Sequence, residues 1–154
     1  SGKSTLLRCL AGLFEADGGV IKRAVGLLYM GHRPGLNELL SPFENLRWYA
    51  GLQERDVSPE PLLSAIHHVG LDRYKDEPCR TLSAGQMRRA ALARLCISKS
   101  RLWLLDEPMT SLDDDAVALV RDLIAKHRSA GGGCICATHI KLEFPQTRVL
   151  ELGA

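Results

Sequence analysis

The sequence predicts an α/β fold in which a mostly parallel β-sheet is flanked by helices and carries an inserted helical subdomain. Short apolar runs alternate with helical patterns at both ends of the chain, as expected where helices join parallel strands. Between them, roughly residues 36–98 are nearly all helical by pattern. The 154 residues, 45% hydrophobic and 25% charged, are enough for one globular domain with its own core.

Five helix patterns are spread along the chain. The first runs over residues 3–14, where leucines recur at helical spacing. The next has a well-marked start, because Ser41 suits the N-cap, Pro42 the first helical position and Glu44 the capping box. Three further helices are expected, over residues 59–71, 82–98 and 113–133. The last of them carries acids at its front and bases at its back, which complements the helix dipole.

Strands are predicted where short apolar runs are bounded by turn residues or proline. Four such runs occur, over residues 25–31, 101–108, 134–139 and 147–153. Two of the five cysteines, Cys134 and Cys136, alternate along the third run, and therefore lie on one face of it. We interpret them as small buried side chains in a reducing compartment, with a metal-binding pair as the alternative.

Composition excludes several classes of function. The formal net charge of +2 implies no strong affinity for polyanions, so no nucleic-acid partner is expected. No apolar run approaches the roughly 18 residues that span a bilayer. The first residue is not methionine, and we therefore expect the sequence to be part of a longer protein.

The opening stretch SGKST resembles the end of a phosphate-binding loop, G-x-x-x-x-G-K-[ST]. Gly2, Lys3 and Ser4 match its last three positions, although the first glycine is absent. Amides at a helix start bind phosphate oxygens, Lys3 would reach the β- and γ-phosphates, and the Ser4 hydroxyl would bind Mg²⁺. A chance glycine–lysine turn is the alternative.

Two acids follow the apolar run LWLL. In α/β sheets, ligands bind at the carboxyl ends of the strands, where Asp106 and Glu107 are expected to lie. Asp106 would hold Mg²⁺, and Glu107 would orient and deprotonate an attacking water. Alone, the pair is equally consistent with solvated acids at the end of a strand.

Two weaker signals complete the pattern. The LSAGQ stretch starts a helix at Ser83 with the small residues Ala84 and Gly85, which let backbone amides approach an anion closely, for instance a phosphate held by another subunit. His139, after CICAT, can reach a γ-phosphate. Taken singly, these are also an ordinary helix cap and a surface histidine.

Together, GKST, LSAGQ, LLDEP, SLD and TH resemble, in this order, the nucleotide-binding domain of an ABC transporter over nearly the whole chain. The resemblance implies a P-loop NTPase that uses ATP and Mg²⁺ in a head-to-tail dimer of two ATPase subunits. It further implies an ABC-type domain over residues 1–154 that lacks its N-terminal strands, so this chain alone should be weak or inactive.

The resemblance assigns a role to each matching residue. The phosphate loop of one subunit would comprise Gly2, Lys3, Ser4 and Thr5, and the signature that contacts the ATP of the other would comprise Ser83, Ala84, Gly85 and Gln86. Asp106 matches the Mg²⁺-associated acid, Glu107 the catalytic base and His139 the switch histidine. Asp113 matches the loop that couples the two sites across the dimer.

One position departs from the family pattern. Arg33 stands where a glutamine usually touches Mg²⁺ and the attacking water. Arginine is always charged and accepts no hydrogen bond, so the glutamine role does not carry over. We hypothesise that Arg33 still belongs to the site, contacting the γ-phosphate, with an orientation toward a partner as the alternative.

The segment YMGHRPGLNELLSPFENLRWYAGL resembles the ATP-binding subunits of cytochrome c biogenesis heme exporters. This implies integral membrane partner subunits, peripheral attachment at the cytoplasmic face of the bacterial inner membrane, and ATP hydrolysis coupled to heme delivery. The alternatives are the ATPase of another ABC exporter and a soluble ABC-type ATPase acting on ribosomes or DNA. A purely regulatory domain is disfavoured by the presence of Glu107.

Overall fold

The computed structural model describes residues 2–53, 57–139 and 144–152. The chain forms two compact units. The first comprises Ser1–Arg33, Lys99–Thr110 and Ile124–Ala154, and the second comprises Pro34–Ser98 and Ser111–Leu123. The sheet belongs to the first unit, and the helices between residues 42 and 97 belong to the second.

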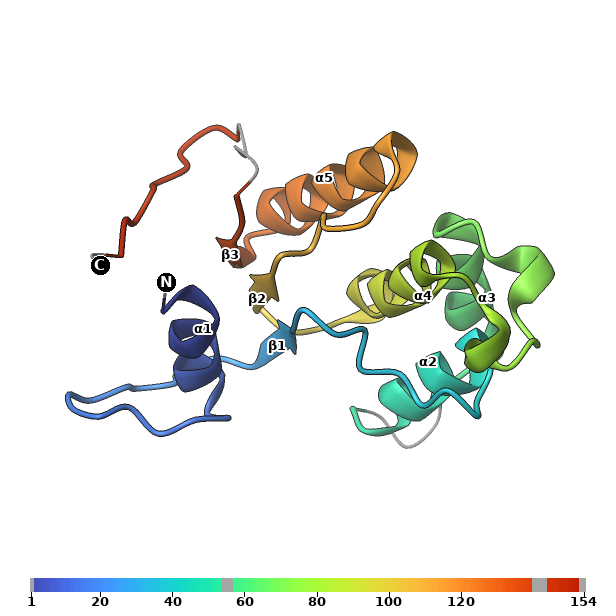
Figure 1. The fold of residues 1–154 in the computed structure, drawn as a ribbon, viewed down its shortest axis with the longest axis horizontal. Helices are drawn as coiled ribbons and strands as arrows, with labels where there is room; N and C mark the ends of the chain where they lie inside the picture. The colour runs from blue at the N-terminus through green and yellow to red at the C-terminus, as the bar shows by residue number, and fades with distance from the viewer. Residues whose placement is uncertain (1, 54–56, 140–143, 153–154) are drawn as a thin grey trace. The chain divides into compact units, whose positions relative to one another are not determined.

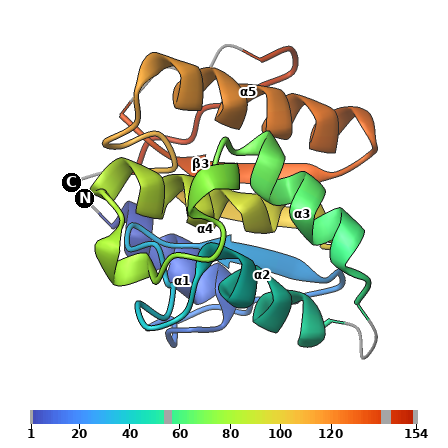
Figure 2. The same ribbon diagram turned by 90° about the vertical axis from the view of Figure 1, so that its right-hand side faces the viewer.

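The first unit is built on a three-stranded parallel sheet in the order β1-β2-β3 (Figure 1, Figure 2). Its strands are β1 (Leu27–Met30), β2 (Leu102–Asp106) and β3 (Gly133–Ala137). In the central strand β2, Leu104 lies opposite Tyr29 on one side and Ile135 on the other. Because the strands are parallel, their carboxyl ends share one edge of the sheet. The predicted α/β class with a parallel sheet is confirmed.

Helix α1 (Lys3–Ala11) packs on this sheet through leucines that recur at helical spacing. Leu7 of α1, Leu104 of β2 and Ala137 of β3 form a buried cluster. The helix ends at Gly12, whose φ of 78° is a left-handed conformation that glycine adopts without strain. This packing fixes the start of α1 relative to the carboxyl ends of the strands.

The second unit contains a small helical core. Its helices are α2 (Pro42–Gly51), α3 (Pro59–His68) and α4 (Ala84–Ile97), with short 3₁₀ turns at Asp72–Tyr74 and Cys79–Thr81. The most deeply buried side chains are apolar residues from all three helices, each at most 1% exposed: Leu46, Leu62, Ile66 and Leu92. The helical pattern expected between residues 36 and 98 is thus present as three mutually packed helices.

The predicted start of α2 is present in detail. The Glu44 amide donates to Ser41 Oγ at 3.2 Å, and the Ser41 amide donates to Glu44 Oε2 at 2.8 Å. Pro42 occupies the first helical turn. Two backbone amides that a helix start would leave unsatisfied are therefore paired.

Helix α5 (Asp114–Ser129) has the predicted charge arrangement, with acids in its first turn and bases in its last. Across residues 2–53, 57–139 and 144–152, no helix combines the length and apolar character that crossing a membrane requires.

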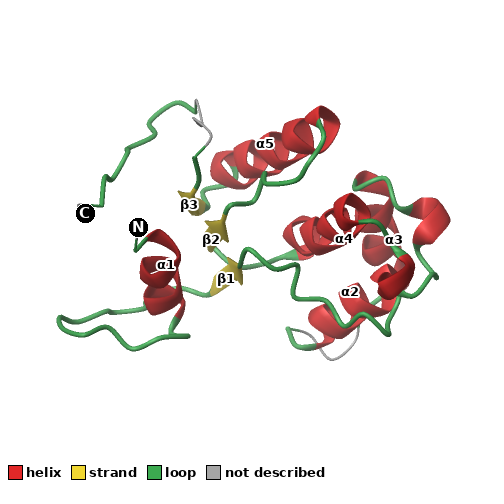
Figure 3. Cartoon of the chain, viewed as in Figure 1, coloured by secondary structure: helices red, strands yellow, loops and turns green. Residues whose placement is uncertain are grey.

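The strand expected over residues 147–153 was wrong for its described part. Residues 147–152 form no strand (Figure 3), and Val149 and Leu150 are 83% and 75% exposed. An apolar alternation becomes a strand only where a neighbouring strand can pair with it. Here the Thr147 amide instead donates to the Phe144 carbonyl at 3.3 Å, which is a turn.

Candidate functional site

The predicted metal-binding pair meets at the carboxyl end of β2. Asp106 is the last residue of this strand and is 1% exposed. Ser4, in the first turn of α1, donates its hydroxyl to Asp106 Oδ1 at 3.0 Å. These residues are 102 positions apart in sequence. They are brought together because α1 packs over the strand that ends in Asp106.

The second oxygen of this carboxylate is unusual. Asp106 Oδ2 is buried and, among the described residues, has no hydrogen-bond partner. A buried carboxylate oxygen without a donor is costly, and a cation or its bound water would satisfy it. The Ser4 hydroxyl and the Asp106 carboxylate offer oxygen ligands, and one carboxylate oxygen lacks a partner. This set fits Mg²⁺, which usually takes one or two protein oxygens and completes its shell with water and phosphate. The residues present therefore fit the ion.

The start of α1 is suited to an anion. Gly2 is the N-cap, with φ 41°, and no described side chain caps the helix or places an acid in its first turn. The first amides of a helix carry partial positive charge and need acceptors. Lys3 and Thr5 occupy this same turn, and Thr5 is exposed. Phosphate oxygens would supply the missing acceptors.

Glu107 lies directly after the strand in a strained conformation. Its φ is 50°, in the left-handed region that non-glycine residues rarely adopt. Its amide donates to the Ala137 carbonyl at 2.8 Å, which fixes the backbone against the end of β3. Thr110 Oγ1 lies 3.4 Å from Glu107 Oε2. Strain of this kind is typical of functional sites, where the surrounding structure holds the residue in place.

His139 lies between an acid and a base. The strand β3 ends at Ala137, and two residues later His139 Nε2 lies 3.3 Å from Glu107 Oε1. Lys3 Nζ is 3.4 Å from each ring nitrogen. A proton on Nε2 satisfies both neighbours, because Nε2–H then donates to Glu107 and Nδ1 accepts from Lys3. The first unit thus brings Lys3, Ser4, Asp106, Glu107 and His139 together.

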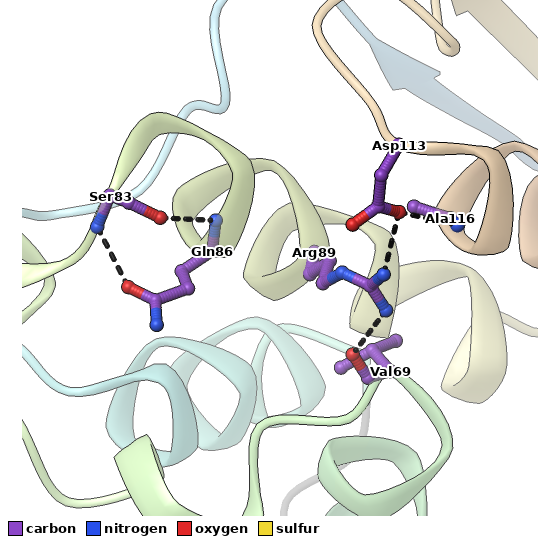
Figure 4. Close-up of polar contacts among 6 residues, drawn as sticks. All are labelled: Val69, Ser83, Gln86, Arg89, Asp113 and Ala116. Atoms are coloured by element: carbon purple, nitrogen blue, oxygen red, sulfur yellow. Dashed lines mark hydrogen bonds and ion pairs between the residues drawn. The ribbon is translucent and has the colours of Figure 1, made fainter.

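The LSAGQ segment starts α4 in the second unit. Ser83 is the N-cap, its Oγ accepts from the Gln86 amide at 3.2 Å, and Gln86 Oε1 accepts from the Ser83 amide at 2.8 Å (Figure 4). A Cβ on Gly85 would meet no described heavy atom within 4 Å. The chain's own packing therefore does not require glycine here. A close approach by an outside group would require it, and the small neighbour Ala84 is exposed as well.

Asp113 has two donors on one oxygen. Its Oδ1 accepts from the Ala116 amide and from Arg89 Nη2, both at 2.8 Å. The Ala116 amide, and after it the Arg89 guanidinium, hold the pKa of Asp113 below its usual value. Our sequence reasoning did not identify Arg89, and its only signal was a helix rich in alanine and arginine. Both residues belong to the second unit.

Arg33 lies three residues beyond β1 and is exposed. We expected Arg33 to belong to the site. It lies in the loop that leaves the carboxyl end of β1, and β1 pairs in parallel with the strand that ends in Asp106. The residue after it is held firmly within the second unit, where Arg94 Nη2 donates to the Pro34 carbonyl at 2.7 Å. Burial lowers the pKa of Arg94.

Comparisons with known proteins show the family of this chain. Residues 1–110 match the family described as ABC transporter. The chain is 41% identical to the cytochrome c biogenesis ATP-binding export protein CcmA of Vibrio parahaemolyticus, covering 99% of this chain and 82% of that protein. It is 42% identical to the CcmA of Hahella chejuensis, covering 100% of this chain and 79% of that protein.

A solved structure supports the fold. It is a dimeric, post-hydrolysis state of the ATP-binding cassette MJ0796 bound to ADP and Pi, with a TM-score of 0.81 and 21% identity, covering 90% of this chain and 70% of that one. At 21% identity, this structural similarity supports a shared fold and nothing further. The sequence matches are closer, and by them this chain belongs to the ABC transporter family of ATP-hydrolysing domains and, within it, to the cytochrome c biogenesis ATP-binding export proteins.

Proposed function

We propose that this chain, as part of its full-length protein and in a dimer, binds Mg²⁺–ATP at the edge of its sheet and hydrolyses it to drive heme export for cytochrome c biogenesis. The observation that carries the proposal is the Ser4–Asp106 pair, at 3.0 Å, with one buried carboxylate oxygen left without a described partner. A structural ion pair or hydrogen-bond network would have satisfied that oxygen from within the protein.

The phosphates are bound by the start of α1 in this proposal. The amides of Gly2, Lys3, Ser4 and Thr5 face the phosphate oxygens, and the Lys3 ammonium reaches the β- and γ-phosphates. Ser4 and Asp106 hold Mg²⁺, which when bound neutralises charge on the phosphates. Lys3 exchanges its contact with His139 for one with the nucleotide.

Glu107 is the proposed general base. Its backbone is fixed by the bond to the Ala137 carbonyl, and Thr110 and His139 each contact one of its carboxylate oxygens. It accepts the proton of the attacking water. His139, within 3.3 Å of Glu107 Oε1, contacts the γ-phosphate and keeps the carboxylate aligned. Both side chains lie at the carboxyl ends of neighbouring parallel strands, where α/β sheets bind ligands.

The remaining residues act on a second copy. In a head-to-tail dimer, the start of α4, from Ser83 to Gln86, contacts the ATP held by the other subunit, and Asp113 couples the two sites. The open space around Gly85 supports this assignment, because an external phosphate can approach there. Arg33 contacts the γ-phosphate in this proposal, and residues 36–98 act as the helical subdomain.

The cargo and location are proposed from the relatives. Proteins about 40% identical over nearly the full chain are named as cytochrome c biogenesis export proteins. We therefore assign this chain to the cytoplasmic face of the bacterial inner membrane, bound to integral membrane subunits that carry heme.

The Glu107→Gln variant tests the chemistry. Turnover is measured here and below on the full-length protein, because this chain spans 82% of the Vibrio parahaemolyticus relative and is expected to be weak alone. Removing the base should lower ATP turnover by about 100-fold or more while ATP still binds. Glu77→Gln is a matched control, since Glu77 is an exposed acid in a turn outside the site, and it should leave turnover unchanged. ATP turnover that survives Glu107→Gln would refute the assigned base.

The cargo requires a separate test. The gene should restore covalently heme-bearing c-type cytochromes in a bacterial strain that lacks its own export ATPase of this pathway. The Glu107→Gln gene should restore none. Turnover without restoration, when the cognate membrane subunits are expressed alongside, would favour the ATPase of another exporter.

A further inference from the structure

Arg89 joins three parts of the second unit through one side chain. It lies on α4, three residues beyond the signature, and its side chain is 22% exposed. Nη2 donates to Asp113 Oδ1 at 2.8 Å, and Nη1 donates to the Val69 carbonyl at 3.3 Å (Figure 4). Val69 is the C-cap of α3 and Asp113 precedes α5. Because the guanidinium is planar and rigid, its hydrogen bond to Asp113 and its hydrogen bond to Val69 have a fixed relative orientation.

Asp113 in turn fixes the start of α5. The oxygen that accepts from Arg89 also accepts from the Ala116 amide, and the Asp113 carbonyl accepts from the Val117 amide at 2.9 Å. Two residues earlier, Ser111 has φ 61°, a left-handed conformation that costs energy for a residue with a Cβ. A loop in such a conformation persists only if its neighbours hold it. The contacts of Asp113 supply that restraint.

We propose that Arg89 is a positioning residue that holds the Asp113 carboxylate on α4, so that the signature and the coupling loop keep one fixed arrangement. The inference rests on the proposed function, in which Ser83 to Gln86 and Asp113 act at the site of a second subunit. Asp113 is 66% exposed, so its carboxylate can still meet that subunit while Arg89 holds it. Arg89 therefore sets the geometry of a contact that it does not itself make.

A merely structural role predicts a different outcome. An ion pair with one exposed partner contributes little to stability, because solvent screens it. Losing such a pair would lower the melting temperature slightly and leave turnover unchanged. A positioning role predicts that ATP turnover falls, whereas the melting temperature and the affinity of the Lys3 loop for ATP stay nearly unchanged.

Arg89→Met tests this, with Arg121→Met as the control because Arg121 is an exposed arginine on α5. Arg89→Met should lower maximal ATP turnover about tenfold, the size expected when one charge-assisted hydrogen bond that orders a site is removed. Binding of a fluorescent ATP analogue should change less than about twofold, and Arg121→Met should resemble the wild type. Arg89→Lys should recover part of the activity, since it keeps the charge but not the two-directional fork.

A double-mutant cycle ties the effect to Asp113. If Arg89 acts through that carboxylate, Arg89→Met combined with Asp113→Asn should turn over no more slowly than Asp113→Asn alone. Losses that multiply, or an Arg89→Met protein as active as the wild type, would overturn the inference. If Glu107→Gln abolishes turnover in the same assay, either of these results refutes the role of Arg89 and leaves the proposed function standing. If Glu107→Gln leaves turnover intact, the proposed function fails and the inference fails with it.

Discussion

The buried amide of Asn45 allows a prediction whose size follows from its contacts. Asn45 lies in the first turn of α2 and is 7% exposed. Its Oδ1 accepts from the Asn37 amide at 2.8 Å. Its Nδ2 lies within 3.3 Å of the carbonyls of Asn37, Leu40 and Ser41, and 3.5 Å from Cys79 Sγ. The Asn45 side chain thus holds the loop that precedes its own helix through hydrogen bonds to the backbone of that loop.

The Asn45→Ala variant removes all of these contacts, but the partner groups are affected unequally. The three carbonyls keep backbone donors, because Asn37 accepts from the Leu40 amide, Leu40 from the Cys79 amide and Ser41 from the amide of residue 45 itself. Only the Asn37 amide loses its acceptor. Asn37 is exposed, so water can in part replace that acceptor, and we expect the free energy of unfolding to fall by about 1 kcal/mol, the net value of a typical hydrogen bond.

The Asn45→Asp variant should be worse, and its deficit should depend on pH. Aspartate keeps an acceptor for the Asn37 amide but places a second oxygen against three carbonyls. Burial and those oxygens disfavour the charged form, so the pKa of the introduced carboxyl is higher folded than its unfolded value of about 3.9. Stability is therefore lost as pH rises above about 4. At pH 7.5 an uncompensated buried charge should cost about 3–5 kcal/mol, and the deficit should shrink at pH 5.

Urea titrations followed by circular dichroism at both pH values would measure these differences. Arg47→Ala, an exposed substitution on the same helix, is the control and should stay within about 0.5 kcal/mol of the wild type. Equal stabilities for the alanine and aspartate variants at pH 7.5, or a deficit of Asn45→Asp that does not shrink at pH 5, would refute the reasoning.

Three further predictions concern other parts of the chain. In Gly132→Ala the new Cβ would lie 2.3 Å from the His127 ring, so calorimetry should show about 1–3 kcal/mol of destabilisation from the displaced ring. Gly85→Ala meets no described atom and lies in a helix, so it should raise stability by up to about 1 kcal/mol in urea titrations while lowering ATP turnover. Burial raises the pKa values of Cys134 and Cys136 to about 12, so mass spectrometry should find neither alkylated by iodoacetamide at pH 8 until the protein is unfolded.

Local signals predicted the helices well, because a cap and its helix lie within a few residues of each other. Ser41 and Glu44 form the expected capping box. Ser83 starts α4 as expected, but its partner Gln86 shows what a motif alone does not reveal. We assigned Gln86 to the ATP of another subunit, whereas its Oε1 is already bonded to the Ser83 amide. Contact with a nucleotide through that oxygen would have to replace the bond that closes the helix start.

Contacts between distant residues were predicted only where chemistry required them. The meeting of Ser4 and Asp106 could be expected from the needs of a bound Mg²⁺. The Arg89–Asp113 pair, 24 residues apart, could not, because α4 carries several arginines with no distinguishing pattern. The strand expected after residue 146 was wrong for a related reason. Alternating apolar residues indicate which face of a strand would be buried. They do not indicate whether a neighbouring strand is available for pairing.

The triplet Glu44–Leu46 lies within the segment that resembles heme-exporter subunits, and its three side chains serve the fold. Glu44 closes the capping box, Asn45 folds the preceding loop and Leu46, 1% exposed, lies in the helical core. None of the three is placed for chemistry on a nucleotide. The motifs GKST and LLDEP instead supply charges and oxygen donors at the sheet edge. The first set therefore holds this loop and helix together, and the second supplies the groups suited to phosphate chemistry. Substitutions in the triplet should accordingly change stability first, and substitutions at Lys3 or Glu107 should change turnover with little effect on stability.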